Sequence, residues 1–222
     1  MHSGYEECRA DSVAIYLFNF EEPFNIFFAD KNQQERDDIY YAGWLDMIMS
    51  AIKGLHFFDK EQKQWQQAHV NASWVILAVV REHAPEVVKF EFSEKDGSPY
   101  FTVHVDRSKL RTEAHKAMSD FLSKLHILKS LGDFEAAKVF FEHYSEVDAE
   151  MLKIRDIVKA RRLPRRLELQ PNLFKRDGKV EYKDYDSSFE GIIQSYCERF
   201  EGEFQKDVYD EWVKDAEKYR YV

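Results

Sequence analysis

Apolar side chains recur every three to four residues along most of the chain, and this period constrains the fold more than any other feature of the sequence. It is the period of amphipathic helices, which bury one face and expose the other. Asp59 and Gln62 have the spacing of a capping box, Pro85 stops a helix, and Gly132 followed by Asp133 is typical of a helix end and the next N-cap. The expected helices span about 5–20, 34–58, 59–83, 114–131, 134–144 and 149–162.

The period changes to two between residues 87 and 105. Val88, Phe90 and Phe92 alternate with polar residues, and the same alternation returns from Phe101 to Val105. The run DGSP lies between the two stretches. We therefore predict a β-hairpin whose loop is somewhat longer than the tight two-residue kind.

The helical pattern breaks near Pro164. Pro164 and Pro171 bracket LELQ, a short strand-like piece, and a polar turn follows at 176–179. Ser187 and Glu190 restart a helix by capping-box spacing, and a last helix runs to Tyr219. We predict a mainly α fold, with a multi-helix portion and one β-hairpin over 1–164 and a short β/α C-terminal extension over 165–222.

Composition excludes several classes of protein. The net charge of −9 over 222 residues leaves no basic excess for binding nucleic acid. Cys8 and Cys197 are the only cysteines, so no disulfide framework is expected and a reducing compartment is favoured. No apolar run approaches the length of a membrane span. We expect a cytoplasmic protein that binds neither nucleic acid nor membranes.

The run YEECRAD at residues 5–11 places carboxylates at the start of the first helix. Glu7 and Asp11 are four residues apart and share one helix face. Spacing alone favours a solvated helix start, because acidic residues in a first turn complement the helix dipole. A zinc site is the other interpretation, but it needs further protein ligands, and the sequence contains no HExxH run and no histidine pair at i, i+4.

Five runs of the sequence resemble motifs of the dipeptidyl peptidase III family of zinc exopeptidases. They are EECRAD at 6–11 (EECRAE in the family), WQQAH at 65–69 (WRQAH), DRSKLR at 106–111 (DRSKIR), LKS with GD at 128–133, and RRL with QPN at 165–172. The runs occur in family order across about 5–200, so the resemblance covers nearly the whole chain.

The resemblance implies roles for individual residues. Glu7 matches the third zinc ligand, and Glu6 and Asp11 match acidic residues that hold the ligating histidines. Asp11 is one methylene shorter than the glutamate usual in the family. His69 matches a histidine that faces the cleft and helps to stabilise the reacting carbonyl.

Two of the implied roles have a structural alternative. His69 shares a helical stripe with Trp65 and Ile76, and a lone histidine on an apolar face is more often a core residue. Arg165 and Arg166 match a basic pair that binds the carbonyls or carboxylate of the peptide, but such cations can instead satisfy the end of the preceding helix.

In this family two zinc-ligand histidines and the catalytic glutamate come from a HELLGH motif, which would lie before residue 1 here. We therefore expect the C-terminal part of a zinc-dependent dipeptidyl peptidase that releases dipeptides from the N-termini of short peptides. Its partner would be the missing N-terminal half of the same enzyme, and the chain alone would be inactive. The alternative is a non-catalytic helical binding module derived from that scaffold.

The family assignment also predicts a geometry. Glu7 and His69 should line one concavity with their side chains roughly 5–12 Å apart, which leaves room for a metal ion and a reacting carbonyl. Arg165 should lie toward the far side of that concavity.

Overall fold

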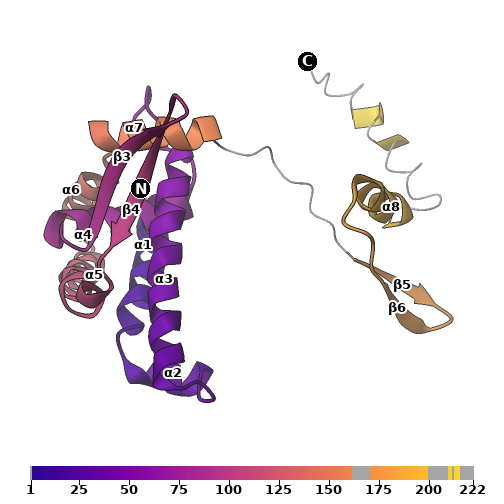
Figure 1. The fold of residues 1–222 in the computed structure, drawn as a ribbon, viewed down its shortest axis with the longest axis horizontal. Helices are drawn as coiled ribbons and strands as arrows, with labels where there is room; N and C mark the ends of the chain where they lie inside the picture. Colours follow the sequence, from indigo (N-terminus) through magenta and orange to yellow (C-terminus); the bar gives the residue numbers. More distant parts are fainter. Residues whose placement is uncertain (1, 162–170, 200–209, 212, 216–222) are drawn as a thin grey trace. The chain divides into compact units, whose positions relative to one another are not determined.

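The structure is a computed structural model, and it describes residues 2–161, 171–199, 210–211 and 213–215. The chain divides into two compact units, residues 1–162 and 163–222 (Figure 1). The assignment of 1–164 and 165–222 to different lobes of a longer enzyme stays a prediction.

The first unit is a helical assembly, as the apolar period predicts. Its α-helices are α1 (His2–Leu17), α2 (Glu21–Phe27), α3 (Gln33–Gly54), α4 (Ala68–His83), α5 (His115–Leu131), α6 (Phe134–Ser145) and α7 (Ala149–Arg161). Within the described ranges, no helix is long and apolar enough to cross a bilayer.

Helix α4 forms the centre of the first unit. Its residues Val75, Ile76, Leu77 and Val79 are completely buried, because α1, α3, α5 and α6 all contact this helix. A helix that is apolar on every side is stable only in such a position. The first turn of α4 is therefore held by its neighbours, and this turn carries His69.

Several helix ends confirm the local signals in the sequence. Gly132 follows α5 with φ of 67°, the left-handed conformation that glycine adopts without strain. The carboxylate of Asp133 then accepts a hydrogen bond from the backbone N–H of Ala136 at 3.0 Å and caps α6.

The predicted helix over 59–83 is wrong in its first third. Asp59 does accept a hydrogen bond from the N–H of Gln62, at 3.0 Å, but it also accepts one from Glu61 at 2.9 Å. These bonds stabilise a turn between two short antiparallel strands, β1 (Phe58–Asp59) and β2 (Gln64–Trp65). Helix α4 starts only at Ala68.

Two other boundaries differ from the prediction. The first helix ends at Leu17, and the short helix α2, which the sequence analysis missed, follows it. Helix α3 ends at Gly54 and passes into a 3-10 turn, Leu55–Phe57. A second 3-10 turn, Arg107–Lys109, and a π-helical turn, Leu110–Ala114, lead into α5.

The predicted β-hairpin is present as β3 (Val88–Lys95) and β4 (Ser98–Val105). Its loop is tighter than predicted, because Lys95 pairs with Ser98 and only Asp96 and Gly97 lie between them. Both loop residues have positive φ, 53° and 71°, which matches the right-handed twist of the two strands.

The second unit contains a hairpin of β5 (Asn172–Arg176) and β6 (Lys179–Lys183), followed by helix α8 (Phe189–Arg199). The predicted cap is displaced by one residue, since the hydroxyl of Ser188 accepts from the N–H of Gly191 at 3.2 Å. The LELQ piece and most of the predicted last helix lie outside the described residues.

Candidate metal and catalytic site

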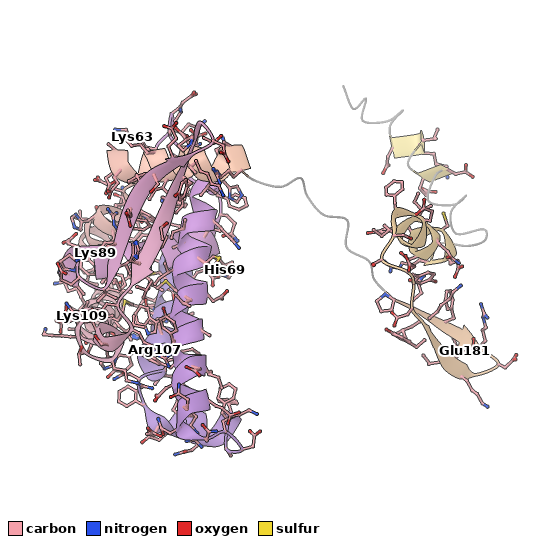
Figure 2. The ribbon with its side chains drawn as sticks, in the orientation of Figure 1. Lys63, His69, Lys89, Arg107, Lys109 and Glu181 are labelled. Carbon is pink, nitrogen blue, oxygen red and sulfur yellow. The ribbon has the colours of Figure 1, made fainter. Side chains whose placement is uncertain are left out.

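Helices α1 and α4 bring Glu7 and His69 into direct contact. The distance from Glu7 Oε2 to His69 Nδ1 is 3.2 Å. The His69 side chain is 64% exposed, and Figure 2 labels it at the surface of the first unit. The alternative that His69 is a core residue is therefore wrong. The apolar stripe was a poor guide because Trp65 belongs to β2, and because His69 in the first turn of α4 is exposed although Ile76 on the same helix is buried.

The contact is closer than the predicted separation of roughly 5–12 Å. Helices α1 and α4 pack directly against each other. Near the start of α1, a Cβ atom at Gly4 would be in ordinary van der Waals contact with Nδ2 of Asn71 on α4, at 3.4 Å. The side chains of Glu7 and His69 thus meet directly between two packed helices, with no third group of the described residues between them.

Asp11 lies one helical turn after Glu7 on α1. Burial raises the pKa of the Asp11 carboxyl above its ordinary value. The electrostatic interaction with His69 opposes this rise in the pKa of Asp11, and that with Glu7 adds to it. Glu7 and His69 are therefore close enough to Asp11 to influence its carboxyl group.

Glu6 has contacts on a different side. Its carboxylate forms an ion pair with Arg9, with Oε2 at 3.3 Å from Nε, and another with Lys129 Nζ of α5. Arg9 also lies 3.4 Å from Nδ1 of His126, again on α5. These contacts join the start of α1 to α5 beside Glu7.

Lys129 is a site neighbour that the sequence analysis did not identify. It stands 123 positions from Glu6, so no local spacing connects them. The available signal was its place in the LKS run at 128–130, which resembles a family motif but to which no role was attached.

The described residues offer a zinc ion only part of a ligand set. Within the described ranges, no group of three or more His, Cys, Asp or Glu side chains could hold a metal ion. The Glu7 carboxylate is 36% exposed and can supply one oxygen, whereas catalytic zinc sites use three protein ligands. The residues present therefore fit the single-ligand contribution that the resemblance implies. Arg165 and Arg166 lie outside the described residues.

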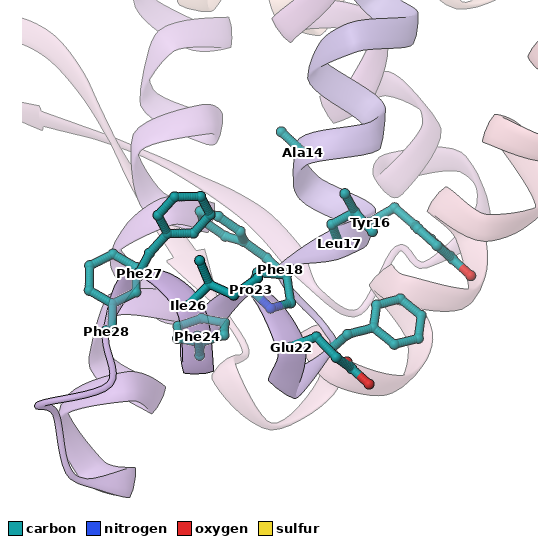
Figure 3. Close-up of a pocket in the computed structure, with 11 residues that line it drawn as sticks. Ala14, Tyr16, Leu17, Phe18, Glu22, Pro23, Phe24, Ile26, Phe27 and Phe28 are labelled. Carbon is teal, nitrogen blue, oxygen red and sulfur yellow. The ribbon is translucent and has the colours of Figure 1, made fainter.

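Three cavities described in the first unit lie away from Glu7 and His69. One, of about 580 Å³, is formed mainly by apolar residues between the end of α1 and α2, among them Phe18, Phe24 and Phe27 (Figure 3). Two others, of about 390 and 300 Å³, border Tyr144 on α6. Neither Glu7 nor His69 lines any of the three, so the concavity predicted at these residues is not one of them.

Comparison with known proteins decides the family. The profile described as "Peptidase family M49" matches residues 1–200. This chain belongs to peptidase family M49. The family resemblance seen in the five sequence runs is thereby confirmed.

The M49 chain has similar relatives among curated proteins. It is 38% identical over 204 residues to dipeptidyl peptidase 3 of Nematostella vectensis, a match that covers 91% of this chain and 28% of that protein. It is 38% identical over 203 residues to the protein of the same name from Rattus norvegicus and 37% identical over 203 residues to that from Homo sapiens. Each of these matches covers 89% of this chain and 27% of the relative. The chain thus spans little more than a quarter of the length of the curated relatives it matches.

Proposed function

We propose that this chain is the C-terminal part of a zinc-dependent dipeptidyl peptidase, which releases dipeptides from the N-termini of short peptides in the cytoplasm. Family membership and the name shared by the relatives support a peptidase. The observation that carries the proposal for this chain is the contact between Glu7 and His69, at 3.2 Å. The two residues come from separate motifs, 62 positions apart, and meet at the surface.

The proposal gives each side chain a role. Glu7 is the zinc ligand from this part of the enzyme. A bound zinc ion would polarise the scissile carbonyl and activate a water molecule. The imidazole of His69 donates a hydrogen bond to the oxygen of the reacting carbonyl as negative charge develops on it. Its exposure leaves it accessible to a peptide.

Glu6 and Asp11 act as carboxylates that hold the two ligating histidines of the N-terminal part, fixing their ring orientation and raising their basicity. The ion pairs of Glu6 with Arg9 and Lys129 restrict its side chain, which supports such an orienting role. Arg165 and Arg166 bind the carbonyls or carboxylate of the peptide through their planar guanidinium groups.

The test compares two proteins, this 222-residue chain and the same reading frame extended upstream of Met1. Zinc content and release of dipeptides from a short peptide are measured for both. The proposal predicts zinc and activity in the extended protein, with weak zinc binding and no release by the 222-residue chain. Stoichiometric, tight zinc in the 222-residue chain would contradict the single-ligand assignment.

An extended protein that folds but neither binds zinc nor releases dipeptides would overturn the enzyme assignment. That result would favour the alternative, a non-catalytic helical binding module built on the same scaffold. An upstream reading frame without a HExxGH motif would lead to the same conclusion.

A further inference from the structure

The imidazole of His69 has few contacts of its own that could fix its position. Among the side-chain contacts described for His69, Glu7 is the partner of its ring nitrogen, and the Ser73 hydroxyl donates to its backbone carbonyl at 3.2 Å. His69 is the second residue of α4. The position of its ring therefore depends on where the first turn of α4 is held.

The first turn of α4 is continuous with the β1–β2 hairpin. The side-chain carbonyl of Gln67 accepts a hydrogen bond from the N–H of Val70 at 2.6 Å and caps the helix. Just before it, the N–H of Gln66 donates to the carbonyl of Phe57 at 3.0 Å, and Trp65 pairs with Phe58. The backbone is thus connected by hydrogen bonds from the hairpin to the turn that carries His69.

Trp65 attaches this segment to a different helix. Its indole N–H donates to the carbonyl of Ser145, the last residue of α6, at 2.8 Å. Carbonyls in the last turn of a helix have no partner within that helix, so this bond also satisfies the end of α6. The indole ring also contacts the rings of Phe58 and Trp74, with centroid distances of 5.2 and 6.0 Å.

We propose that Trp65 is a positioning residue for His69. It holds the segment four residues before His69 against the end of α6, whereas Glu7 is carried by α1, which packs against α4. Loss of the indole bond lets the start of α4 move relative to α1 and weakens the contact between His69 and Glu7. The consequence for catalysis rests on the proposed function, whereas the structural consequence does not.

The chain contains a matched control in Trp74. Its indole N–H donates to the carbonyl of Glu146, the residue after Ser145, at 3.1 Å. Trp74 therefore makes the same type of bond to the adjacent carbonyl, but from the middle of α4, five residues after His69. If the indole bonds only anchored their own side chains at the end of α6, without regard to where they lie along the chain, the loss of either would have the same effect on His69.

The experiment records NMR cross-peaks between the His69 ring protons and the Glu7 side chain in the 222-residue chain. We expect the cross-peak in the wild type and in Trp74→Phe, and its loss or several-fold weakening in Trp65→Phe. Incorporation of benzothienylalanine at position 65 keeps the ring size and removes only the N–H donor, and it should have the same effect in a chain that folds. An unchanged cross-peak in the Trp65 variants, or equal weakening in Trp74→Phe, would overturn the proposal.

Kinetics in the extended protein supply the second readout. Trp65→Phe should lower kcat about tenfold or more with KM and zinc content unchanged, because a misplaced catalytic group affects the transition state more than binding. Trp74→Phe should retain kcat within about threefold. If the extended protein shows no activity at all, the proposed function fails, and the NMR result still decides the role of Trp65.

Discussion

His69 is the residue on which the catalytic interpretation depends most. Its ring pairs with a carboxylate on a neighbouring helix, yet its side chain remains largely exposed to solvent. His104 provides a useful comparison, because its Nε2 lies 2.8 Å from a carboxylate oxygen of Glu91 on the β3–β4 hairpin. A histidine–carboxylate pair is therefore not special by itself. What distinguishes His69 is its position beside Glu7 and Asp11.

We predict that His69→Phe in the extended protein lowers kcat about 10²–10³-fold, the size expected for loss of one hydrogen-bond donor to a developing oxyanion. Zinc content should not change, because the proposed function gives His69 no role as a metal ligand. His104→Phe, at an exposed pair far along the chain, should retain full activity. Steady-state kinetics and metal analysis of the three proteins check this, and zinc loss in His69→Phe would show that its role was misassigned.

Cys8, directly after Glu7, has a different environment. Its side chain is completely buried, and burial raises the pKa of its thiol to about 12. Above about pH 9 the unfolded chain loses this proton while the folded chain keeps it, so stability falls between about pH 9 and pH 12.

The thiol prediction has two measurements. A thiol reagent at neutral pH should label the exposed Cys197 and leave Cys8 unmodified in the folded chain. Urea unfolding should show stability falling above about pH 9, at up to about 1.4 kcal/mol per pH unit. Cys8→Ala should lose this part of the pH dependence, and Cys197→Ala should keep it. Rapid labelling of both thiols without denaturant would contradict the burial of Cys8.

The site residues were predictable from the sequence to different degrees. Glu7 and His69 were found because each lies in a run that resembles a family motif. Spacing alone would have assigned one to a solvated helix start and the other to the core. Lys129 was missed because its contact with Glu6 joins distant parts of the chain, and the tertiary structure that brings them together has no local pattern in the sequence.

At the level of elements, the close approach of α3 to α4 depends on Gly54. A Cβ atom at this position would lie 2.1 Å from Cγ1 of Val70, the residue after His69. Gly54 is buried, so the new methyl group fits only if the Val70 side chain changes its rotamer or the helices move apart. The absence of a side chain here lets the end of α3 pack against the first turn of α4.

We predict that Gly54→Ala lowers the free energy of unfolding by about 1–3 kcal/mol, as expected for overpacking in a well-packed core. Alanine has the higher helix propensity, so propensity alone would predict the opposite sign. Ser50→Ala, at an exposed position of the same helix, should change stability by less than about 0.5 kcal/mol. Urea unfolding of both variants checks the sign, and an unchanged or stabilised Gly54→Ala would contradict the close approach.

The ends of helices could be predicted where a short sequence signal is compatible with only one local structure. Gly132 and Asp133 gave the end of α5 and the start of α6, because left-handed glycine and an aspartate cap follow local rules. Asp59 misled the prediction, because the same side chain can cap a helix or stabilise a turn. The backbone pairing of Phe58 with Trp65 stabilises the hairpin, and in this context Asp59 caps a turn instead of a helix.

At the scale of the whole molecule, the chain represents little more than a quarter of its curated relatives. It carries one carboxylate that fits a zinc ligand and a histidine in contact with it. The proposed enzyme needs the remaining ligands and the general base from elsewhere. The central claim is therefore that Glu7 completes a zinc site assembled with another part of the protein.

Zinc affinity of the extended protein with and without Glu7→Gln tests this claim most directly. The variant keeps the size of the side chain and removes the anionic ligand. We predict about one tightly bound zinc ion in the wild type and in the control Glu61→Gln, an exposed glutamate in the β1–β2 turn, with at least about tenfold weaker binding in Glu7→Gln. Wild-type zinc affinity in Glu7→Gln would contradict the account.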